Sequence, residues 1–308
     1  MNSSPVFVIV PGASQTPSHY AHIIHLLQAR GHGTLTALLP SGGATRLVSA
    51  AEDAEFVRSR MILPILDIEK YDVILIMHSY GGLPGSAAAR GLGSADRATS
   101  GRKTAVLGQI FIASILPHGG NGEDVIALLG GKWPSFIDVH ESEQRIKCDQ
   151  PKIPLYDDVP PLISKGTELS SISQSIQCFT SPCPLTSWHE EAFFGRCAYI
   201  RTRNDQAVPY EVQNAMLDST VTMQNWVIRD IAAGNSPQLA LPEKLVEIIL
   251  AISQQFEVLP LPTTSREGLD LSFSVGKYQL SSLVRAQTRW LTSRVKGLVH
   301  HRSGRKLQ

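Results

Sequence analysis

Residues 72–82, DVILIMHSYGG, limit the possible folds more than any other part of the chain. The apolar run predicts a buried strand over residues 72–77. It passes directly into Ser79-Tyr80-Gly81-Gly82, and the stretch from Gly81 to Gly91 is rich in small residues. Small residues allow a helix to approach a sheet closely. The segment therefore predicts a buried strand, a tight turn and a helix that packs on the sheet.

Similar apolar runs recur along the chain. They predict further strands at residues 5–10, 34–39, 105–113, 197–202 and 224–229. Between the strands, apolar residues at helical spacing predict helices over about 20–31, 47–69, 209–217 and 242–255, with Pro64 bending or dividing the second. Alternating strands and helices are typical of an α/β fold with a mostly parallel central sheet flanked by helices.

The alternation breaks between residues 117 and 190, where eight prolines and many serines leave little periodicity. A structureless loop of this length is uncommon in a compact domain, so we expect an inserted helical cap. The predicted organisation is a core of residues 1–116 and 191–254, a cap of 117–190, a linker of 255–276 and a basic amphipathic segment of 277–308.

Charge is distributed unevenly. The whole chain has a formal net charge of +1, but residues 277–308 contain eight Lys or Arg and no acidic residue. The remainder has 20 basic and 27 acidic residues, a formal charge of −7. An acidic body without a basic groove argues against nucleic-acid binding. The basic segment could lie on a membrane surface, contact a partner or dock on its own domain.

The spacing of the cysteines fits neither a metal site nor a disulfide framework, so we expect free thiols at Cys148, Cys178, Cys183 and Cys197. The first residues lack a basic segment followed by a long apolar one, and no apolar run reaches ~18 residues, so we expect neither a secretory signal nor a membrane span. These features predict a cytoplasmic protein. The chain has no phosphate-binding glycine motif and no metal-ligand cluster, so we expect no cofactor and no metal.

Five segments, taken in order, resemble the α/β-hydrolase superfamily: VFVIVPGAS, LLPSGG, VILIMHSYGG, YIRTRNDQAVP and AAGNSPQLALPEKL. More narrowly, they resemble its small esterase and hydroxynitrile-lyase-like branch, in the form common in fungal secondary-metabolite pathways. The resemblance covers about residues 5–254. It implies a nucleophile elbow, G-x-S-x-G with the serine at a strained apex, although Met77 stands where the first glycine is expected.

The resemblance also implies roles for individual residues. Ser79 falls on the nucleophile and Asp205 on the acid of the triad. The backbone N–H of Tyr80 falls on one oxyanion donor, and that of Ala13, in the loop Gly12-Ala13-Ser14 after the first strand, falls on the second. Such donors can each lower a reaction barrier by ~3 kcal/mol.

The catalytic histidine of the family has no counterpart, because its G-H-S-P segment is Gly234-Asn235-Ser236-Pro237 in this chain. An amide does not titrate near neutral pH, so Asn235 cannot take the proton of Ser79, although it can orient a water or a substrate oxygen. The hydroxynitrile lyases of this branch use a hydroxyl just after the first strand and a lysine after the histidine. Here Gly12 and Ser236 stand at those places, which disfavours cyanohydrin cleavage, although Ser14 offers a hydroxyl nearby.

Three alternatives remain open for the missing base. His189 or His78 could replace it, and a serine ester or lactone hydrolase would follow. Ser79 could instead act only as a hydrogen-bond donor. The third alternative is loss of activity, which would leave a non-catalytic protein that binds small molecules.

In the second alternative, Asp205 would work with Glu52 or Asp53 as acid and base. The replacement at Asn235 favours this chemistry. We therefore expect an enzyme of secondary metabolism that acts on a small hydrophobic, polyketide- or terpenoid-like substrate without an acyl-enzyme. Epoxide hydrolysis with ring-opening cyclisation, or a lyase reaction, would fit these groups.

Overall fold

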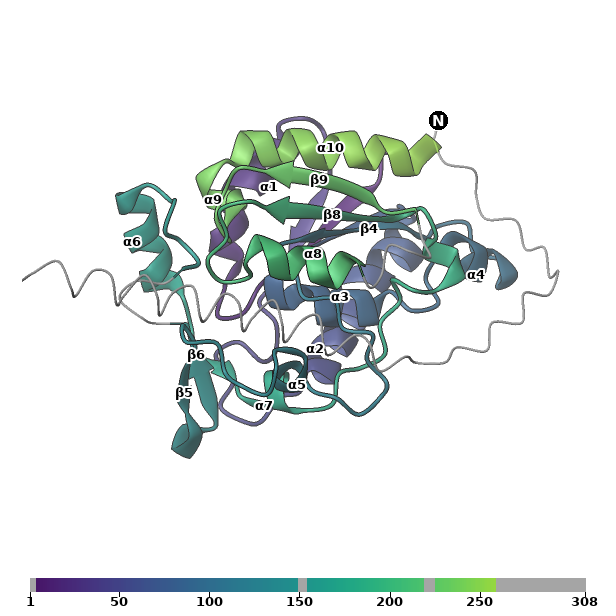
Figure 1. The fold of residues 1–308 in the computed structure, drawn as a ribbon. Coiled ribbons are helices and arrows are strands. Elements are labelled where there is room, and N and C mark those ends of the chain that lie inside the picture. Colours follow the sequence, from purple (N-terminus) through teal and green to yellow (C-terminus); the bar gives the residue numbers. More distant parts are fainter. Residues whose placement is uncertain (1–3, 149–153, 219–224, 259–308) are drawn as a thin grey trace, which may run out of the picture.

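Six parallel strands form the central sheet, in the order β2-β1-β3-β4-β8-β9 (Figure 1). The computed structural model describes residues 4–148, 154–218 and 225–258. The strands are β1 (Val6–Val10), β2 (Thr34–Thr36), β3 (Val73–His78), β4 (Val106–Ile112), β8 (Cys197–Thr202) and β9 (Val227–Ile231). The predicted α/β class and parallel sheet are confirmed. β2 is shorter than predicted, and β9 begins three residues later than predicted.

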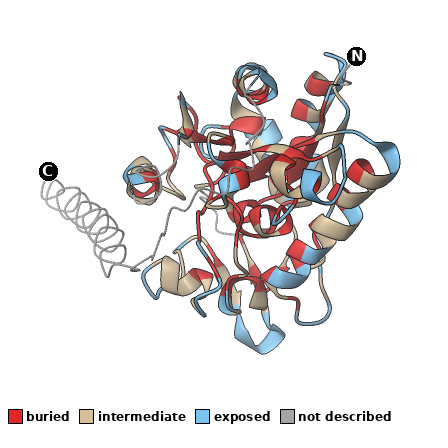
Figure 2. Ribbon diagram, turned by 90° about the vertical axis from the view of Figure 1, so that its right-hand side faces the viewer, coloured by how far each residue is buried: buried red, intermediate tan, exposed pale blue. Residues whose placement is uncertain are grey.

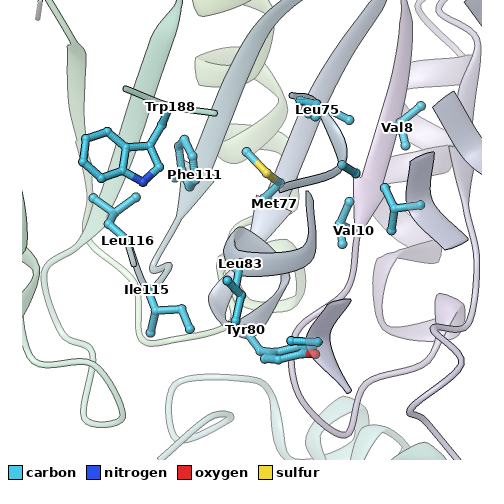
Figure 3. Packing of buried hydrophobic residues seen from close by; sticks show 14 of the residues in the cluster. Val8, Val10, Leu75, Met77, Tyr80, Leu83, Phe111, Ile115, Leu116 and Trp188 are labelled. Carbon is cyan, nitrogen blue, oxygen red and sulfur yellow. The ribbon is translucent and has the colours of Figure 1, made fainter. Parts of the chain in front are cut away.

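Helices cover both faces of the sheet. Successive strand residues point to opposite sides, so an apolar strand presents apolar side chains on both faces, and each face is buried under helices. Phe7 and Ile9 of β1 pack against α1 (Ala21–Gln28) and α10 (Pro242–Val258) on one face. On the other face, the alternate residues pack against α2 (Ala50–Phe56) and α3 (Gly82–Ala88). Figure 3 shows Val8, Val10, Leu75 and Met77 of the strands together with Leu83 of α3. Figure 2 shows that buried residues follow the sheet and the inner sides of the helices.

The second predicted helix begins at Ala50 and remains helical to Glu69, through α2 and the wider turns η2 (Val57–Ile62) and η3 (Ile65–Glu69). Ser49 caps its start: the Ser49 hydroxyl accepts the Glu52 N–H, and the Glu52 carboxylate accepts the Ser49 N–H at 2.9 Å. Glu52 also pairs with Arg46 at 2.7 Å on the surface. Glu52 is therefore part of a helix cap and lies outside the polar groups around Ser79.

The segment between residues 117 and 190 contains strands as well as the predicted short helices. Its helices are α5 (Val125–Leu128), α6 (Pro161–Ser170) and α7 (Gln177–Thr180). A small antiparallel sheet joins β5 (Asp138–His140), β6 (Arg145–Lys147) and β7 (Gln174–Ser175). Strands of two or three residues are too short to show an alternating pattern, which is why the sequence did not indicate them.

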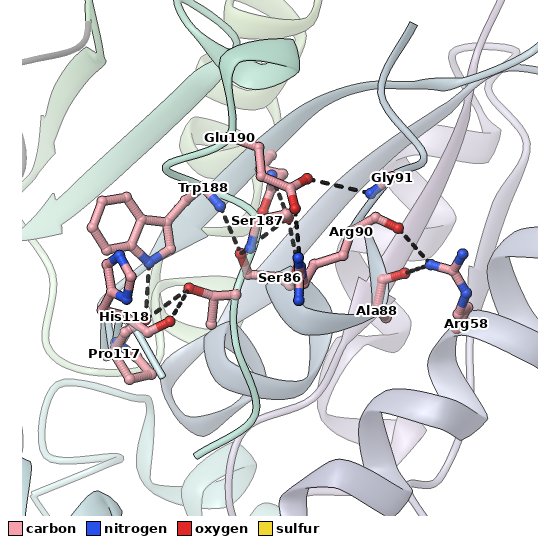
Figure 4. Close-up of polar contacts among 12 residues, drawn as sticks. Arg58, Ser86, Ala88, Arg90, Gly91, Pro117, His118, Ser187, Trp188 and Glu190 are labelled. Carbon is pink, nitrogen blue, oxygen red and sulfur yellow. Dashed lines mark hydrogen bonds and ion pairs between the residues drawn. The ribbon is translucent and has the colours of Figure 1, made fainter. Parts of the chain in front are cut away.

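The cap rejoins the core beside α3, the helix that follows Ser79 (Figure 4). The Ser187 N–H donates to the Ser86 hydroxyl at 3.2 Å, and the Ser187 hydroxyl donates to the Ser86 carbonyl at 2.6 Å. The Trp188 N–H donates to the same Ser86 hydroxyl, and Arg90 forms an ion pair with Glu190 at 2.9 Å. These bonds fix one end of the cap to the elbow helix.

The remaining helices are α4 (Ser94–Thr99), α8 (Tyr210–Asp218), α9 (Pro237–Ala240) and the short turns η1 (Pro17–Tyr20), η4 (Ser79–Gly81), η5 (Glu141–Glu143) and η6 (Glu191–Phe193). All four cysteines are buried and none is joined in a disulfide, as predicted. In the described ranges, no helix is long and apolar enough to cross a membrane. The basic segment 277–308 and most of the predicted linker lie outside the described residues.

A methyl group added at Gly81 should destabilise the fold. A Cβ atom there would lie 2.7 Å from the Pro11 carbonyl oxygen and closer still to that of Val10. Because both contacts are backbone, we expect Gly81→Ala to lower the free energy of unfolding by about 2 kcal/mol or more in urea denaturation.

Gly166→Ala is the matched control, because no atom lies within 4 Å of a Cβ added to Gly166 in α6. Alanine is the better helix former, so this variant should be unchanged or stabilised by up to about 1 kcal/mol. An equal loss of stability in both variants would contradict the close approach of backbone at Gly81.

Candidate active site

Ser79 stands at the sharp turn between β3 and α3. Its φ angle is +51°, in the left-handed region that costs a non-glycine residue energy. Two glycines make the turn possible. A Cβ atom on Gly82 would lie 2.7 Å from the Ile115 carbonyl oxygen, and a Cβ atom on Gly81 would clash with the Val10 carbonyl oxygen of β1. The chain thus forms the strand, turn and helix geometry that presents a serine at the end of a central strand.

Two backbone N–H groups border the cavity beside Ser79. Tyr80 is in the first turn of the helix, where N–H groups have no partner within the helix. Ala13 lies in the loop after β1, and among the described residues its N–H makes no hydrogen bond. The loop is close to the serine, since a Cβ on Gly12 would lie 3.2 Å from the Ser79 Cβ. We call the N–H groups of Ala13 and Tyr80 the oxyanion notch; together they can stabilise a negatively charged oxygen.

Ser14 faces the cap rather than the cavity. Its φ angle is +59°, and its N–H donates to Gln174 Oε1 at 3.0 Å. The Ser14 hydroxyl accepts the Cys148 N–H at 3.3 Å. Ser14 does not line the cavity around Ser79. Its hydroxyl therefore connects the loop after β1 to the cap.

Asn235 occupies the loop after β9 and bonds to Asp205. The Asn235 amide nitrogen donates to Asp205 Oδ2 at 3.0 Å. The same carboxylate accepts the Thr202 hydroxyl and the N–H groups of Ala207 and Val208, each at 2.8 Å. Burial raises the pKa of Asp205 to about 6, although these hydrogen bonds oppose the shift. The structure thus brings Ser79, Asn235 and Asp205 together, with an amide where a triad would have an imidazole.

His78 is next to Ser79 in sequence but is held in a separate buried network. Its Nε2 lies 2.8 Å from the Asn235 carbonyl oxygen, so the ring donates its N–H there. Its Nδ1 lies 2.9 Å from the Tyr20 hydroxyl and 3.0 Å from Gln15 Oε1. Burial lowers the pKa of His78 to about 4, which leaves the ring neutral at pH 7. Since both ring nitrogens face protein groups other than Ser79, His78 is poorly placed to take a proton from Ser79.

Sequence reasoning missed Tyr20 and Gln15. The Tyr20 hydroxyl also accepts the Gly12 N–H at 2.9 Å and bonds to the Gln15 side chain. Tyr20 occurs in an apolar helical pattern, and a buried tyrosine hydroxyl usually finds a polar partner, but the sequence does not identify that partner. The network holds the loop after β1 in place beside Ser79.

His189 lies away from Ser79. Its ring stacks on His118 at a centroid distance of 4.0 Å, and it does not line the cavity. Burial, assisted by the charge of neighbouring groups, lowers the pKa of His189 to about 4. The structure therefore separates this predicted replacement base from the serine.

Asp53 is buried on the other side of Tyr80. Its carboxylate accepts the N–H and the hydroxyl of Ser41, and it accepts the Tyr80 hydroxyl at 2.8 Å. Burial raises the pKa of Asp53 to about 6. Asp53 does not line the cavity. It positions the side chain of Tyr80, whose N–H belongs to the oxyanion notch.

The cavity over Ser79 is mainly apolar. Much of its wall comes from the cap, which the sequence did not indicate because the cap lacks periodicity: Leu129, Pro134, Phe136, Ile137, Cys148, Leu155 and Phe179. The core adds Ile115, Ala207 and Val208. Polar groups reach it at one end, from Gln15, His78, Ser79 and Asn235. Across the described ranges, no group of three or more His, Cys, Asp or Glu side chains is arranged to hold a metal ion. The cavity suits a hydrophobic molecule with one oxygen-bearing end.

Comparison with known proteins identifies the family. The profile of the Alpha/beta hydrolase family matches residues 7–248. The chain belongs to this family. As an alpha/beta hydrolase it is similar to "Alpha/beta hydrolase nvfD" from Aspergillus novofumigatus, with 26% identity over 80% of this chain and 95% of that protein. It is also 23% identical to "Probable hydrolase R7" from Phoma sp., over 80% of this chain and 97% of that protein.

Solved structures agree with the alpha/beta hydrolase fold. A pyrethroid hydrolase from Sphingobium faniae superposes with a TM-score of 0.63 at 20% identity, covering 82% of this chain and 98% of that one. Tomato methylketone synthase I, complexed with 2-tridecanone, superposes with a TM-score of 0.55 at 16% identity, covering 82% and 99%. The predicted resemblance to the superfamily is confirmed, and family and relatives together support a hydrolase-fold enzyme.

The raised pKa of Asp205 should make the effect of Asp205→Asn depend on pH. The pKa rises from its usual 3.8 to about 6, so between these values the folded protein keeps a proton that the unfolded chain has lost. This stabilisation is present below about pH 4 and is lost as the pH rises through about 6. The asparagine variant lacks it.

The difference in unfolding free energy between wild type and variant should therefore shrink by about 2 kcal/mol between about pH 4 and pH 7. Urea denaturation across this pH range measures this difference. The contribution of Asp53, whose pKa is also raised, cancels because both proteins contain it. A difference that grows with pH would mean that the pKa of Asp205 is lowered on folding.

Proposed function

We propose that this alpha/beta hydrolase acts on a small hydrophobic metabolite by chemistry that forms no acyl-enzyme. The observation that carries the proposal is the hydrogen bond from the Asn235 amide to Asp205. The Asn235 amide, which does not titrate near neutral pH, stands where an acyl-transfer cycle needs a base. Serine is a weak nucleophile without such a base, so Ser79 acts as a hydrogen-bond donor.

The catalytic power then comes from the oxyanion notch. In a lyase reaction on a β-hydroxy carbonyl compound, the substrate hydroxyl loses its proton to water and its oxygen becomes the carbonyl of one product. The carbon–carbon bond breaks at the same time, and its electron pair moves into the adjacent carbonyl of the other product, whose oxygen becomes negative. The N–H groups of Ala13 and Tyr80 stabilise this oxygen, and the Ser79 hydroxyl can add a third hydrogen bond. The carbanion carbon of the enolate product takes its proton from water. Ring opening of an epoxide places the same demand on the notch. Water or a substrate hydroxyl attacks one ring carbon, the carbon–oxygen bond breaks, and the epoxide oxygen becomes negative before it takes up the proton that the attacking oxygen loses.

Carboxylate acid–base catalysis has less support from the geometry. Asp205 is covered by Asn235, Asp53 is bonded to Ser41 and Tyr80, and neither carboxylate lines the cavity. The two predicted histidine replacements are also unfavourable, since the ring nitrogens of His78 face the Asn235 carbonyl and the Tyr20 hydroxyl and His189 is outside the cavity. Stabilisation of a negative oxygen is therefore the chemistry that the site supports best.

Restoring the histidine should restore ester hydrolysis. In Asn235→His, the ring can donate to Asp205 and reach toward Ser79, and a general base contributes about 10²–10⁴-fold. We expect kcat/KM for p-nitrophenyl butyrate to rise at least about 100-fold over wild type. The double variant Ser79→Ala, Asn235→His is the matched control and should lose the gain. A wild-type protein that already hydrolyses this ester through Ser79 as fast as the variant would contradict the proposal.

A further inference from the structure

The Asn235 side-chain oxygen is an unused hydrogen-bond acceptor at the polar end of the cavity. Asn235 is fully buried, and among the described residues its Oδ1 has no hydrogen-bond partner. Other buried polar atoms without a partner belong to residues outside the cavity wall, including Ser236 and Gln238 in the same loop. Of the residues that the structure describes, Asn235 alone combines an unsatisfied buried polar atom with a place in the cavity wall. An unsatisfied buried acceptor costs stability, so a ligand that satisfies it gains affinity.

The amide is fixed in orientation by its other end. The Asn235 nitrogen donates to Asp205, so the oxygen is the group left for a ligand. A hydrogen bond to a buried carboxylate polarises the amide and makes its oxygen a better acceptor. The Nε2 atom of a histidine lies on the far side of the imidazole ring, whereas the asparagine oxygen is bonded directly to Cγ. The asparagine oxygen therefore reaches less far from the backbone. Asparagine is shorter than histidine, and Asn235 and Ser79 both line the cavity. Among the described residues, no hydrogen bond joins their side chains across the space between them.

We propose that this space is a subsite for a hydroxyl group of the substrate, which donates to Asn235 Oδ1 while a neighbouring carbonyl occupies the oxyanion notch. The inference rests on the proposed function and names its substrate class, hydrophobic hydroxy-carbonyl compounds. An amide oxygen only accepts, so the ligand must supply a donor. A neutral hydroxyl fits better than an ammonium group, because the walls are apolar and Asp205 already accepts four hydrogen bonds.

A matched pair of probes tests the subsite. Benzylacetone carries the carbonyl and an apolar ring, and its counterpart with a hydroxyl on the benzylic carbon adds only the donor. Dissociation constants are measured by ligand-observed NMR titration of the full chain. We expect wild type to bind the hydroxy ketone about 3- to 10-fold more tightly, the range of one hydrogen bond to a buried acceptor.

Two variants show whether Asn235 is responsible. Asn235→Leu keeps the branched shape and the number of heavy atoms but removes the acceptor, so it should bind the two ketones equally. Gln238→Leu removes another unsatisfied buried amide of the same loop, outside the cavity, and should keep the wild-type preference. Thermal unfolding checks that both variants fold.

The outcomes separate this inference from the proposed function. Equal binding of both ketones by wild type would overturn the hydroxyl subsite, leave the proposed function standing and indicate that water fills the space. A preference that persists in Asn235→Leu would also overturn the role of Asn235. If neither ketone binds folded wild type, the cavity is not a site for hydrophobic carbonyl compounds, and both the inference and the proposed function fail.

Discussion

The hydrogen bond between the Asn235 amide and Asp205 determines what this site can do. It keeps a buried carboxylate satisfied at the position of a triad acid, together with the Thr202 hydroxyl and two backbone N–H groups. It also fixes the amide so that only its oxygen remains free. The architecture of a serine hydrolase is thereby preserved around a group that cannot accept the serine proton.

The rest of the site is rigid, which suits catalysis by fixed donors. Ser79 is held at a positive φ angle by the close approach of Gly81 and Gly82 to neighbouring backbone. The Asp53 carboxylate anchors the Tyr80 side chain from one side, and the His78 network anchors the loop of Gly12 from the other. Donors positioned in this way need no reorganisation when charge develops on a substrate oxygen.

The core of the fold was predictable because long apolar runs and glycine-rich turns carry a local signal. The strand β3, the turn at Ser79 and the parallel sheet follow from such runs. The contacts of polar side chains were not predictable in the same way. Asp53 and His189 stood out by residue type, yet three-dimensional packing directs one toward Ser41 and Tyr80 and the other toward His118.

The cap shows the same limit. Its strands of two or three residues have no periodicity, and its contribution to the cavity depends on how it folds back over Ser79. The family resemblance placed Asn235 and Asp205 in the site, because both positions lie in motifs that follow strands of the sheet, but it did not predict the hydrogen bond between them. Local motifs therefore located the centre of the site, while its walls required the structure.

The most direct measurement for the central claim is the reactivity of Ser79 toward a fluorophosphonate probe, followed by intact-mass spectrometry of the wild-type protein. Such probes require a serine activated by a base. The account predicts no adduct on Ser79 under conditions that fully label a serine esterase measured in parallel. Rapid stoichiometric labelling that disappears in Ser79→Ala would show an activated nucleophile and would contradict the account.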